Sequence, residues 1–106
     1  MSKSYPNTSL YINGKWRPAE SGETLDVINP ATEEVIGNVA RAGKADLDEA
    51  LEAAEKAFTK WKTTSAFDRY NILRRAAELL RKRADIIAEI MTIEQGKPLA
   101  EAKGET

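Results

Sequence analysis

The amino-acid sequence changes in character once, close to Gly43, and this change limits the folds that are open to the chain. Residues before Gly43 are rich in β-branched and aromatic side chains and are interrupted by Gly, Pro and Asn, as is typical of short strands and turns. Residues after Gly43 are rich in Ala, Leu, Glu, Lys and Arg at helical spacing. Strands followed by helices predict an α/β arrangement in which helices cover a small sheet and form a single unit with it.

Two antiparallel strand pairs are expected in the first part of the chain. The dipeptide Asn13-Gly14 favours a two-residue type I′ turn, and the runs on either side of it predict a hairpin that places Tyr11 opposite Trp16. Two further strands, over residues 24–28 and 34–40, flank an Asn-Pro turn. Strand pairs of this size are not stable without helices or further strands packed on them.

The first predicted helix runs over residues 46–62 and is amphipathic. Gly43 is the expected N-cap, and Asp46 lies in the first turn, where the helix dipole favours a negative charge. Roughly a third of the helix circumference is apolar. This apolar face consists of Leu47, Ala50, Leu51, Ala54, Phe58 and Trp61.

A second helical stretch begins after Ser65 and ends at the stop signal formed by Gly96 and Pro98. Because this stretch is longer than most globular helices, we expect a break near residues 83–85. Its apolar face consists of Ile72, Leu73, Ala76, Ala77, Leu80, Ile87, Ile90 and Met91. A further helix starts at Leu99 and meets no stop signal, so the chain is expected to be incomplete at its end.

Composition excludes several classes of function. The 106 residues include no cysteine and no histidine, so a thiolate nucleophile, a Cys/His zinc site and an imidazole base are ruled out for this chain. With 16 Lys and Arg against 17 Asp and Glu, the net charge of −1 does not favour nucleic acid or an anionic membrane as a partner. The polar start, Met1 to Ser9, lacks the apolar core of a signal peptide, which predicts a cytoplasmic protein.

Basic residues gather in the second helical stretch. The densest basic cluster is Arg74, Arg75, Arg81, Lys82 and Arg83. Most of these side chains lie opposite the apolar face, and Glu78 lies one turn from three of them, which favours a solvated face over a nucleic-acid site. No G-x-G-x-x-G or P-loop spacing is present, so no cofactor-binding residue is assigned.

Glu94 conflicts with the helical pattern around it. Continuing the apolar period from Ile87 and Ile90 brings Glu94 to the apolar side, where a buried carboxylate would need a cation or a hydrogen-bond donor. If the last helical turn rotates outward instead, Glu94 lies in water. The sequence leaves both possibilities open.

Five segments together resemble the N-terminal part of the NAD(P)-dependent aldehyde dehydrogenase superfamily. They are LYINGKW at residues 10–16, VINPATEEVIG at residues 27–37, the first helix with Ala53-Ala54 and Phe58-x-x-Trp61, Arg69 with Ile72-Leu73, and EQGKPLAEAKGE at residues 94–105. Each segment alone is weak, but their order and separation are specific. The last segment most resembles the succinate-semialdehyde dehydrogenases, followed by related semialdehyde dehydrogenases.

The resemblance implies a fold and its extent. We expect an α/β fragment with N-terminal antiparallel strand pairs followed by two or three amphipathic helices, part of an aldehyde dehydrogenase nucleotide-binding domain. Residues 1–106 would form an incomplete N-terminal portion of that domain. Its strands would span about residues 10–40, its helices about residues 44–95, and the start of a further helix residues 99–106.

The resemblance also implies an activity for the parent protein. That protein is expected to oxidise an aldehyde, most simply succinate semialdehyde, to the carboxylic acid with NAD or NADP, and to form a homo-oligomer. In the family, the cysteine nucleophile, the glutamate base and the nucleotide-binding residues all lie further along the chain. This chain alone is therefore expected to hold no catalytic residue and to be inactive. The alternatives are a non-catalytic helical interaction module and another aldehyde dehydrogenase of the same superfamily.

One family site maps onto residues of this chain. Many members bind a monovalent cation through carbonyl oxygens just before the Asn-Pro turn and an acidic residue before the Gly-Lys-Pro turn, which here are Val27, Ile28 and Glu94. The sequence departs from the family at Glu33, where a glycine is usual. A positive φ would be costly for glutamate, so the turn is expected to differ slightly.

Overall fold

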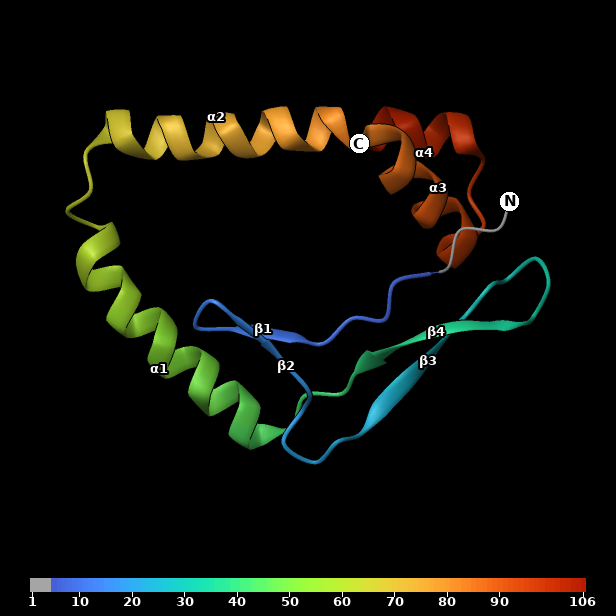
Figure 1. Cartoon of the computed structure of the whole chain (residues 1–106), viewed down its shortest axis with the longest axis horizontal. Coiled ribbons are helices and arrows are strands. Elements are labelled where there is room, and N and C mark those ends of the chain that lie inside the picture. The colour runs from blue at the N-terminus through green and yellow to red at the C-terminus, as the bar shows by residue number, and fades with distance from the viewer. Residues whose placement is uncertain (1–4) are drawn as a thin grey trace. The chain divides into compact units, whose positions relative to one another are not determined.

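The structure is a computed structural model that describes residues 5–106 (Figure 1). The elements follow the predicted order of strands and then helices. They are β1 (Leu10–Ile12), β2 (Lys15–Arg17), β3 (Thr24–Ile28), β4 (Val35–Ala40), α1 (Lys44–Trp61), α2 (Ala66–Lys82), α3 (Ala84–Gln95) and α4 (Leu99–Glu105).

The described residues form two compact units, so the prediction of a single unit is wrong. The hairpin unit comprises the described residues up to Val27 together with Ile36–Thr63, and the helical unit comprises Ile28–Val35 together with Thr64–Thr106. The reason is that the amphipathic pattern indicates which side of each helix is apolar but does not indicate what packs against that side.

The first strand pair of the hairpin unit has the predicted register. β1 pairs antiparallel with β2, and Tyr11 lies opposite Trp16 with ring centroids 4.8 Å apart. Asn13 and Gly14 have φ values of 52° and 76°, as a type I′ turn requires. The local turn chemistry therefore fixes this hairpin.

The second strand pair consists of β3 and β4. In the hairpin unit, the segment before β1 lies beside β4 through a parallel bridge between Thr8 and Val39, and the Ala40 amide donates to the Thr8 carbonyl at 2.8 Å. Gly37 permits this approach, because a Cβ atom there would lie 2.6 Å from the Tyr5 ring. This isolated bridge was not expected from the sequence.

The turn between β3 and β4 belongs to the helical unit. The Asn29 side chain accepts a hydrogen bond from the Ala31 amide at 2.9 Å, and the Glu33 amide donates to the Asn29 carbonyl at 2.8 Å. Glu33 has a φ of 62°, which costs a residue with a side chain about 1–2 kcal/mol. The turn thus keeps the positive φ despite the departure from glycine.

The ends of the helices follow the predicted signals. Gly43 is the N-cap of α1, and the Ser65 hydroxyl accepts a hydrogen bond from the Asp68 amide at 3.1 Å at the start of α2. The expected break occurs at Arg83, between α2 and α3. Gly96 ends α3 in the left-handed conformation, with φ 80°.

Buried side chains are few among residues 5–106. The buried apolar residues are Ala19 in the hairpin unit and Ala88 and Ala102 in the helical unit, where α3 contacts α4. The apolar faces predicted for α1 and α2 are exposed instead of packed. Their exposed large residues are Leu47, Leu51, Phe58, Trp61, Ile72, Leu73 and Leu80. No helix formed by these residues is long and apolar enough to cross a membrane.

Candidate functional site

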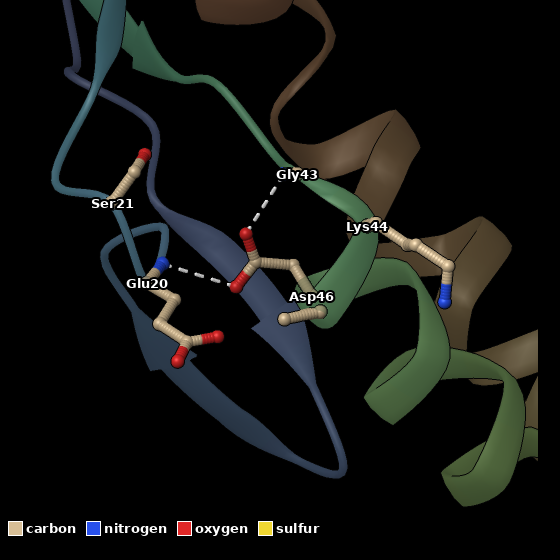
Figure 2. Close-up of a pocket in the computed structure, with 6 residues that line it drawn as sticks. Glu20, Ser21, Gly43, Lys44 and Asp46 are labelled. Atoms are coloured by element: carbon tan, nitrogen blue, oxygen red, sulfur yellow. Dashed lines mark hydrogen bonds between the residues drawn. The ribbon is translucent and has the colours of Figure 1, made fainter.

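A buried carboxylate at the start of α1 is the centre of the best-defined polar site. Asp46 is only 2% exposed, and its two oxygens accept three hydrogen bonds. The Gly43 amide donates at 2.9 Å, the Glu20 amide at 3.1 Å and Arg17 Nη1 at 2.7 Å. Figure 2 shows the carboxylate between the two backbone donors. Asp46 thus joins the loop after β2 to the first turn of α1.

Arg17 extends this network to a second carboxylate. It ends β2, and its guanidinium pairs through Nη2 with Glu49, one turn further along α1. Arg17 Nη1 also donates to the Pro18 carbonyl at 2.8 Å. We call the set of Arg17, Gly43, Asp46 and Glu49 the clasp, because it connects the hairpin to the helix within the hairpin unit.

The charges of the clasp reinforce each other. The Gly43 amide and then the Arg17 guanidinium lower the pKa of Asp46 below its usual value, and Asp46 in turn raises the pKa of Arg17. Both side chains are therefore charged near neutral pH. A carboxylate that is ionised and hydrogen-bonded on both oxygens does not suit a general acid or a nucleophile, so the clasp is a structural feature.

An opening of about 300 Å³ lies beside the clasp, lined by Glu20, Ser21, Gly43, Lys44, Ala45 and Asp46. The Lys44 side chain points away from Asp46 in Figure 2, and its ammonium pairs with Asp48 at 2.6 Å. Two carboxylates facing the opening disfavour the phosphates of a dinucleotide. The opening therefore does not fit a nicotinamide cofactor.

The three residues predicted to bind a cation do not all lie in one unit. Val27 belongs to the hairpin unit, whereas Ile28 and Glu94 belong to the helical unit. The Glu94 side chain is exposed, which matches the alternative of an outward-turned last helical turn. Within the part of the chain that the structure describes, no three Asp or Glu side chains are grouped to hold a metal. Because the predicted site relies on carbonyl oxygens, it stays a prediction.

The basic residues of α2 lie on a solvated face, as predicted. Arg74 Nε lies 3.4 Å from a Glu78 oxygen, and Arg74 Nη1 donates to the Tyr70 hydroxyl at 2.6 Å. Arg75, Arg81, Lys82 and Arg83 are exposed. This face resembles the ordinary charged side of an amphipathic helix.

Sequence reasoning placed Asp46 correctly but missed its partner. Arg17 and Asp46 are 29 residues apart in sequence, and no local pattern reports a contact at that separation. One feature of the sequence pointed to Arg17 as a contact residue: it lies at the end of the hairpin, before a proline that ends the strand.

Comparison with known proteins defines the class. Residues 16–106 match the Aldehyde dehydrogenase family, which is most of the chain. The chain therefore belongs to the aldehyde dehydrogenase family, as its segments from the hairpin to the Gly-Lys-Pro turn predicted.

Several proteins similar to this chain are named as semialdehyde dehydrogenases. A glutarate-semialdehyde dehydrogenase of Pseudomonas putida is 53% identical over 90% of this chain. The succinate-semialdehyde dehydrogenase [NADP(+)] of Escherichia coli is 45% identical over 89% of the chain. The crystal structure of succinate-semialdehyde dehydrogenase from Burkholderia pseudomallei matches 92% of the chain with a TM-score of 0.89 and 46% identity.

The matched regions are a small part of those enzymes. This chain spans 20% of the length of the Pseudomonas and Escherichia relatives and 20% of the Burkholderia chain. The fold seen here thus occurs elsewhere as a portion of a polypeptide about five times as long.

Proposed function

We propose that the protein to which this chain belongs oxidises a semialdehyde carrying a second carboxylate, such as succinate or glutarate semialdehyde, to the dicarboxylic acid with NAD or NADP. The main support is the identity of 53% and 45% to enzymes named for these two substrates, over about nine tenths of the chain. Residues 1–106 would be an N-terminal portion of the nucleotide-binding domain, and the reactive groups would come from the rest of the protein.

The part played by this chain is positioning. A nicotinamide dinucleotide supplies the hydride acceptor when it is bound to such an enzyme. The opening beside Asp46 does not fit that group, since the carboxylates of Glu20 and Asp46 are part of its lining. What the chain supplies is a scaffold, in which the clasp holds the hairpin against α1 and Gly96 turns the chain between α3 and α4.

We further propose a cytoplasmic homo-oligomer that takes a small aldehyde and binds neither nucleic acid nor membrane. The net charge of −1 supports the last point, because a polyanion binder needs a basic surface. The oligomer rests on the family resemblance.

The activity is tested with the complete protein. Its kcat/KM is measured for succinate semialdehyde, glutarate semialdehyde and butanal, each with NAD and with NADP. We expect at least one carboxylated substrate to exceed butanal by about tenfold or more, because a site built to pair a carboxylate rejects an analogue that leaves its polar groups unpaired. Equal values for all three aldehydes, or no aldehyde-dependent reduction of either nucleotide, would contradict the proposal.

A cation site is also proposed for the complete protein. The carbonyl oxygens of Val27 and Ile28 and the carboxylate of Glu94 would bind a monovalent cation, which hard oxygen ligands suit. Replacing choline chloride by potassium or sodium chloride at equal ionic strength should raise the Tm of the wild type and of the control Glu101→Gln, but not that of Glu94→Gln. A rise of the same size in Glu94→Gln would rule Glu94 out as a ligand.

A further inference from the structure

The turn of the first hairpin places an asparagine carboxamide beside an accessible backbone nitrogen. Asn13 and Gly14 are both exposed, and the residues that flank them, Ile12 and Lys15, pair with each other. The ladder hydrogen bonds at a two-residue turn are made by its flanking residues, so the Gly14 amide takes no part in them. Among residues 5–106, no atom outside the neighbouring residues lies within 4 Å of the place that a Gly14 Cβ would take.

This arrangement permits the loss of the carboxamide without an enzyme. The Gly14 nitrogen gives up its proton to solvent base and attacks Asn13 Cγ. The bond between Cγ and Nδ2 breaks, Nδ2 takes up a proton and leaves as ammonia, and a cyclic succinimide is formed. The attack is unhindered because glycine carries no Cβ.

Water then opens the succinimide. Cleavage of the bond from the Gly14 nitrogen to Cγ leaves an aspartate. Cleavage of the bond from the same nitrogen to the Asn13 carbonyl carbon leaves an isoaspartate, in which the main chain runs through the former side chain. The overall change takes in one water and releases one ammonia, and no atom is oxidised or reduced.

The hairpin is short enough for its turn to take part in this reaction. Ring closure requires the Asn13 backbone to rotate out of the turn conformation, because Cγ must come onto the Gly14 nitrogen. β1 and β2 have three residues each, and a two-stranded hairpin of this size is only marginally stable by itself. Local unfolding of the turn therefore has a low free energy.

Two other asparagines lack a usable neighbouring nitrogen. Asn29 precedes Pro30, which has no backbone N–H to deprotonate. Asn71 precedes Ile72 within α2, where the branched side chain hinders attack and the amide belongs to the helical hydrogen-bond ladder.

The two remaining asparagines hold each other in place. The Asn7 side-chain oxygen accepts a hydrogen bond from the Asn38 amide at 3.0 Å, and the Thr8 amide donates to the Asn38 carbonyl at 3.1 Å. The Thr8 nitrogen, which would have to attack Asn7, is thus already engaged. Asn38 lies within β4 and precedes Val39, whose branched side chain hinders attack.

A carboxylate at position 13 would change the charge balance between the hairpin turn and α1. A second opening in the hairpin unit, of about 150 Å³, is lined by Asn13, Glu49, Glu52, Ala53 and Lys56. Lys56 already pairs with Glu52 at 3.0 Å, and Glu49 already pairs with Arg17. The new charge would therefore meet two carboxylates and no unpaired cation in this opening, which is repulsive.

We propose that Asn13 is a site of spontaneous deamidation, and that the carboxylate formed there weakens the contact between the hairpin turn and α1. The proposal does not depend on the reaction that the complete protein catalyses. It makes one prediction about the site of modification and one about its effect on stability.

The site is tested by incubating the purified 106-residue chain in alkaline and in mildly acidic buffer. Peptides from an acidic digest are then analysed by mass spectrometry, with enzymatic detection of isoaspartate. The Asn13 peptide should yield both aspartate and isoaspartate, and faster in the alkaline buffer. The peptides with Asn7, Asn29, Asn38 and Asn71 should convert more slowly by about tenfold or more, because the following nitrogen is hindered, engaged or without a proton. Conversion of Asn13 no faster than that of Asn38 or Asn71 would overturn the assignment.

The effect on stability is tested with Asn13→Asp, which carries the product's charge and keeps the turn, because Asp-Gly also favours type I′. Its urea midpoint should be lower than that of the wild type at low salt. The shift should shrink at high salt, which screens exposed charges, and in the Glu52→Gln background. Asn71→Asp is the matched control: it adds the same charge at an exposed position one turn before Arg75, so it should not lower the midpoint.

Two results would overturn the proposed weakening. One is an Asn13→Asp midpoint equal to that of the wild type at low salt. The other is a shift of the same size at low and high salt and in the Glu52→Gln background, which would mean that the substitution acts through the turn itself and not through charge.

Discussion

At the scale of single residues, Asp46 has the most demanding environment in the described part of the chain. It is almost fully buried, and its charge is tolerated because two backbone amides and one guanidinium donate to it. The position of Asp46 in the first helical turn was predictable from the sequence. The contact with Arg17 was not, because it joins two elements that only the folded chain brings together.

Asp46 gives a prediction about pH. Its folded-state pKa lies below the ordinary value of 3.8, so the unfolded chain takes up the proton first as the pH falls. The stability that the carboxylate contributes is therefore complete above the ordinary pKa and is lost as the pH drops through the lower folded-state pKa.

The measurement is urea unfolding of the chain as a function of pH. The free energy of unfolding of the wild type should exceed that of Asp46→Asn by a constant amount at neutral pH, and the excess should shrink below about pH 4. Asp48 is exposed on the same helix, so Asp48→Asn serves as the control. It should lower the free energy of unfolding by less than Asp46→Asn does at every pH. If the difference in free energy of unfolding between the wild type and Asp46→Asn does not change with pH, Asp46 is not an ionised, hydrogen-bonded carboxylate.

At the scale of elements, short-range signals were sufficient for the first hairpin and for the ends of the helices. The Asn13-Gly14 turn set the register of the first hairpin, Gly43 and Ser65 marked two helix starts, and Arg83 lies at the expected break. Each of these features depends on residues only a few positions apart. The parallel bridge at Thr8 was missed because it joins residues 31 positions apart, Thr8 and Val39.

The end of α3 gives a prediction at this scale. Gly96 has a positive φ, and a Cβ atom there would lie 2.9 Å from Pro30 Cγ. Gly96→Ala should therefore lower the free energy of unfolding by more than about 1 kcal/mol. Gly104 lies in α4 with open space around it, so the matched variant Gly104→Ala should raise the free energy of unfolding, by up to about 1 kcal/mol.

Both variants are compared with the wild type by urea unfolding of the chain. If Gly96→Ala unfolds at the wild-type urea concentration, the left-handed conformation at this cap is not important for stability. If the urea midpoints of both variants shift in the same direction, the change in stability reflects the loss of a glycine and not the backbone conformation at Gly96.

At the scale of the whole molecule, the most informative property is how little is buried. Alanines form the buried apolar set among residues 5–106, while large residues such as Leu73 and Phe58 are exposed. Periodicity predicted correctly which residues share a helix face. It could not predict that the faces are uncovered, because packing depends on surfaces that lie far away in sequence or outside the chain.

The same reasoning limits what could be inferred about function. Family membership was recognisable from five ordered segments and agrees with the match over residues 16–106. The site residues that carry the family's reaction could not be predicted here, since the resemblance implies a cysteine nucleophile and the chain contains no cysteine. Under the proposed function, this chain would be a scaffold for chemistry that the rest of the protein performs.

The most direct measurement is the aldehyde-dependent reduction of NAD and of NADP by the purified 106-residue chain, with succinate and glutarate semialdehyde as substrates. The complete Pseudomonas putida glutarate-semialdehyde dehydrogenase serves as the positive control. We predict that the chain alone gives no reduction above the rate without protein, whereas the control turns over. Turnover by a homogeneous preparation of the chain would contradict the assignment of the reactive groups to the rest of the protein.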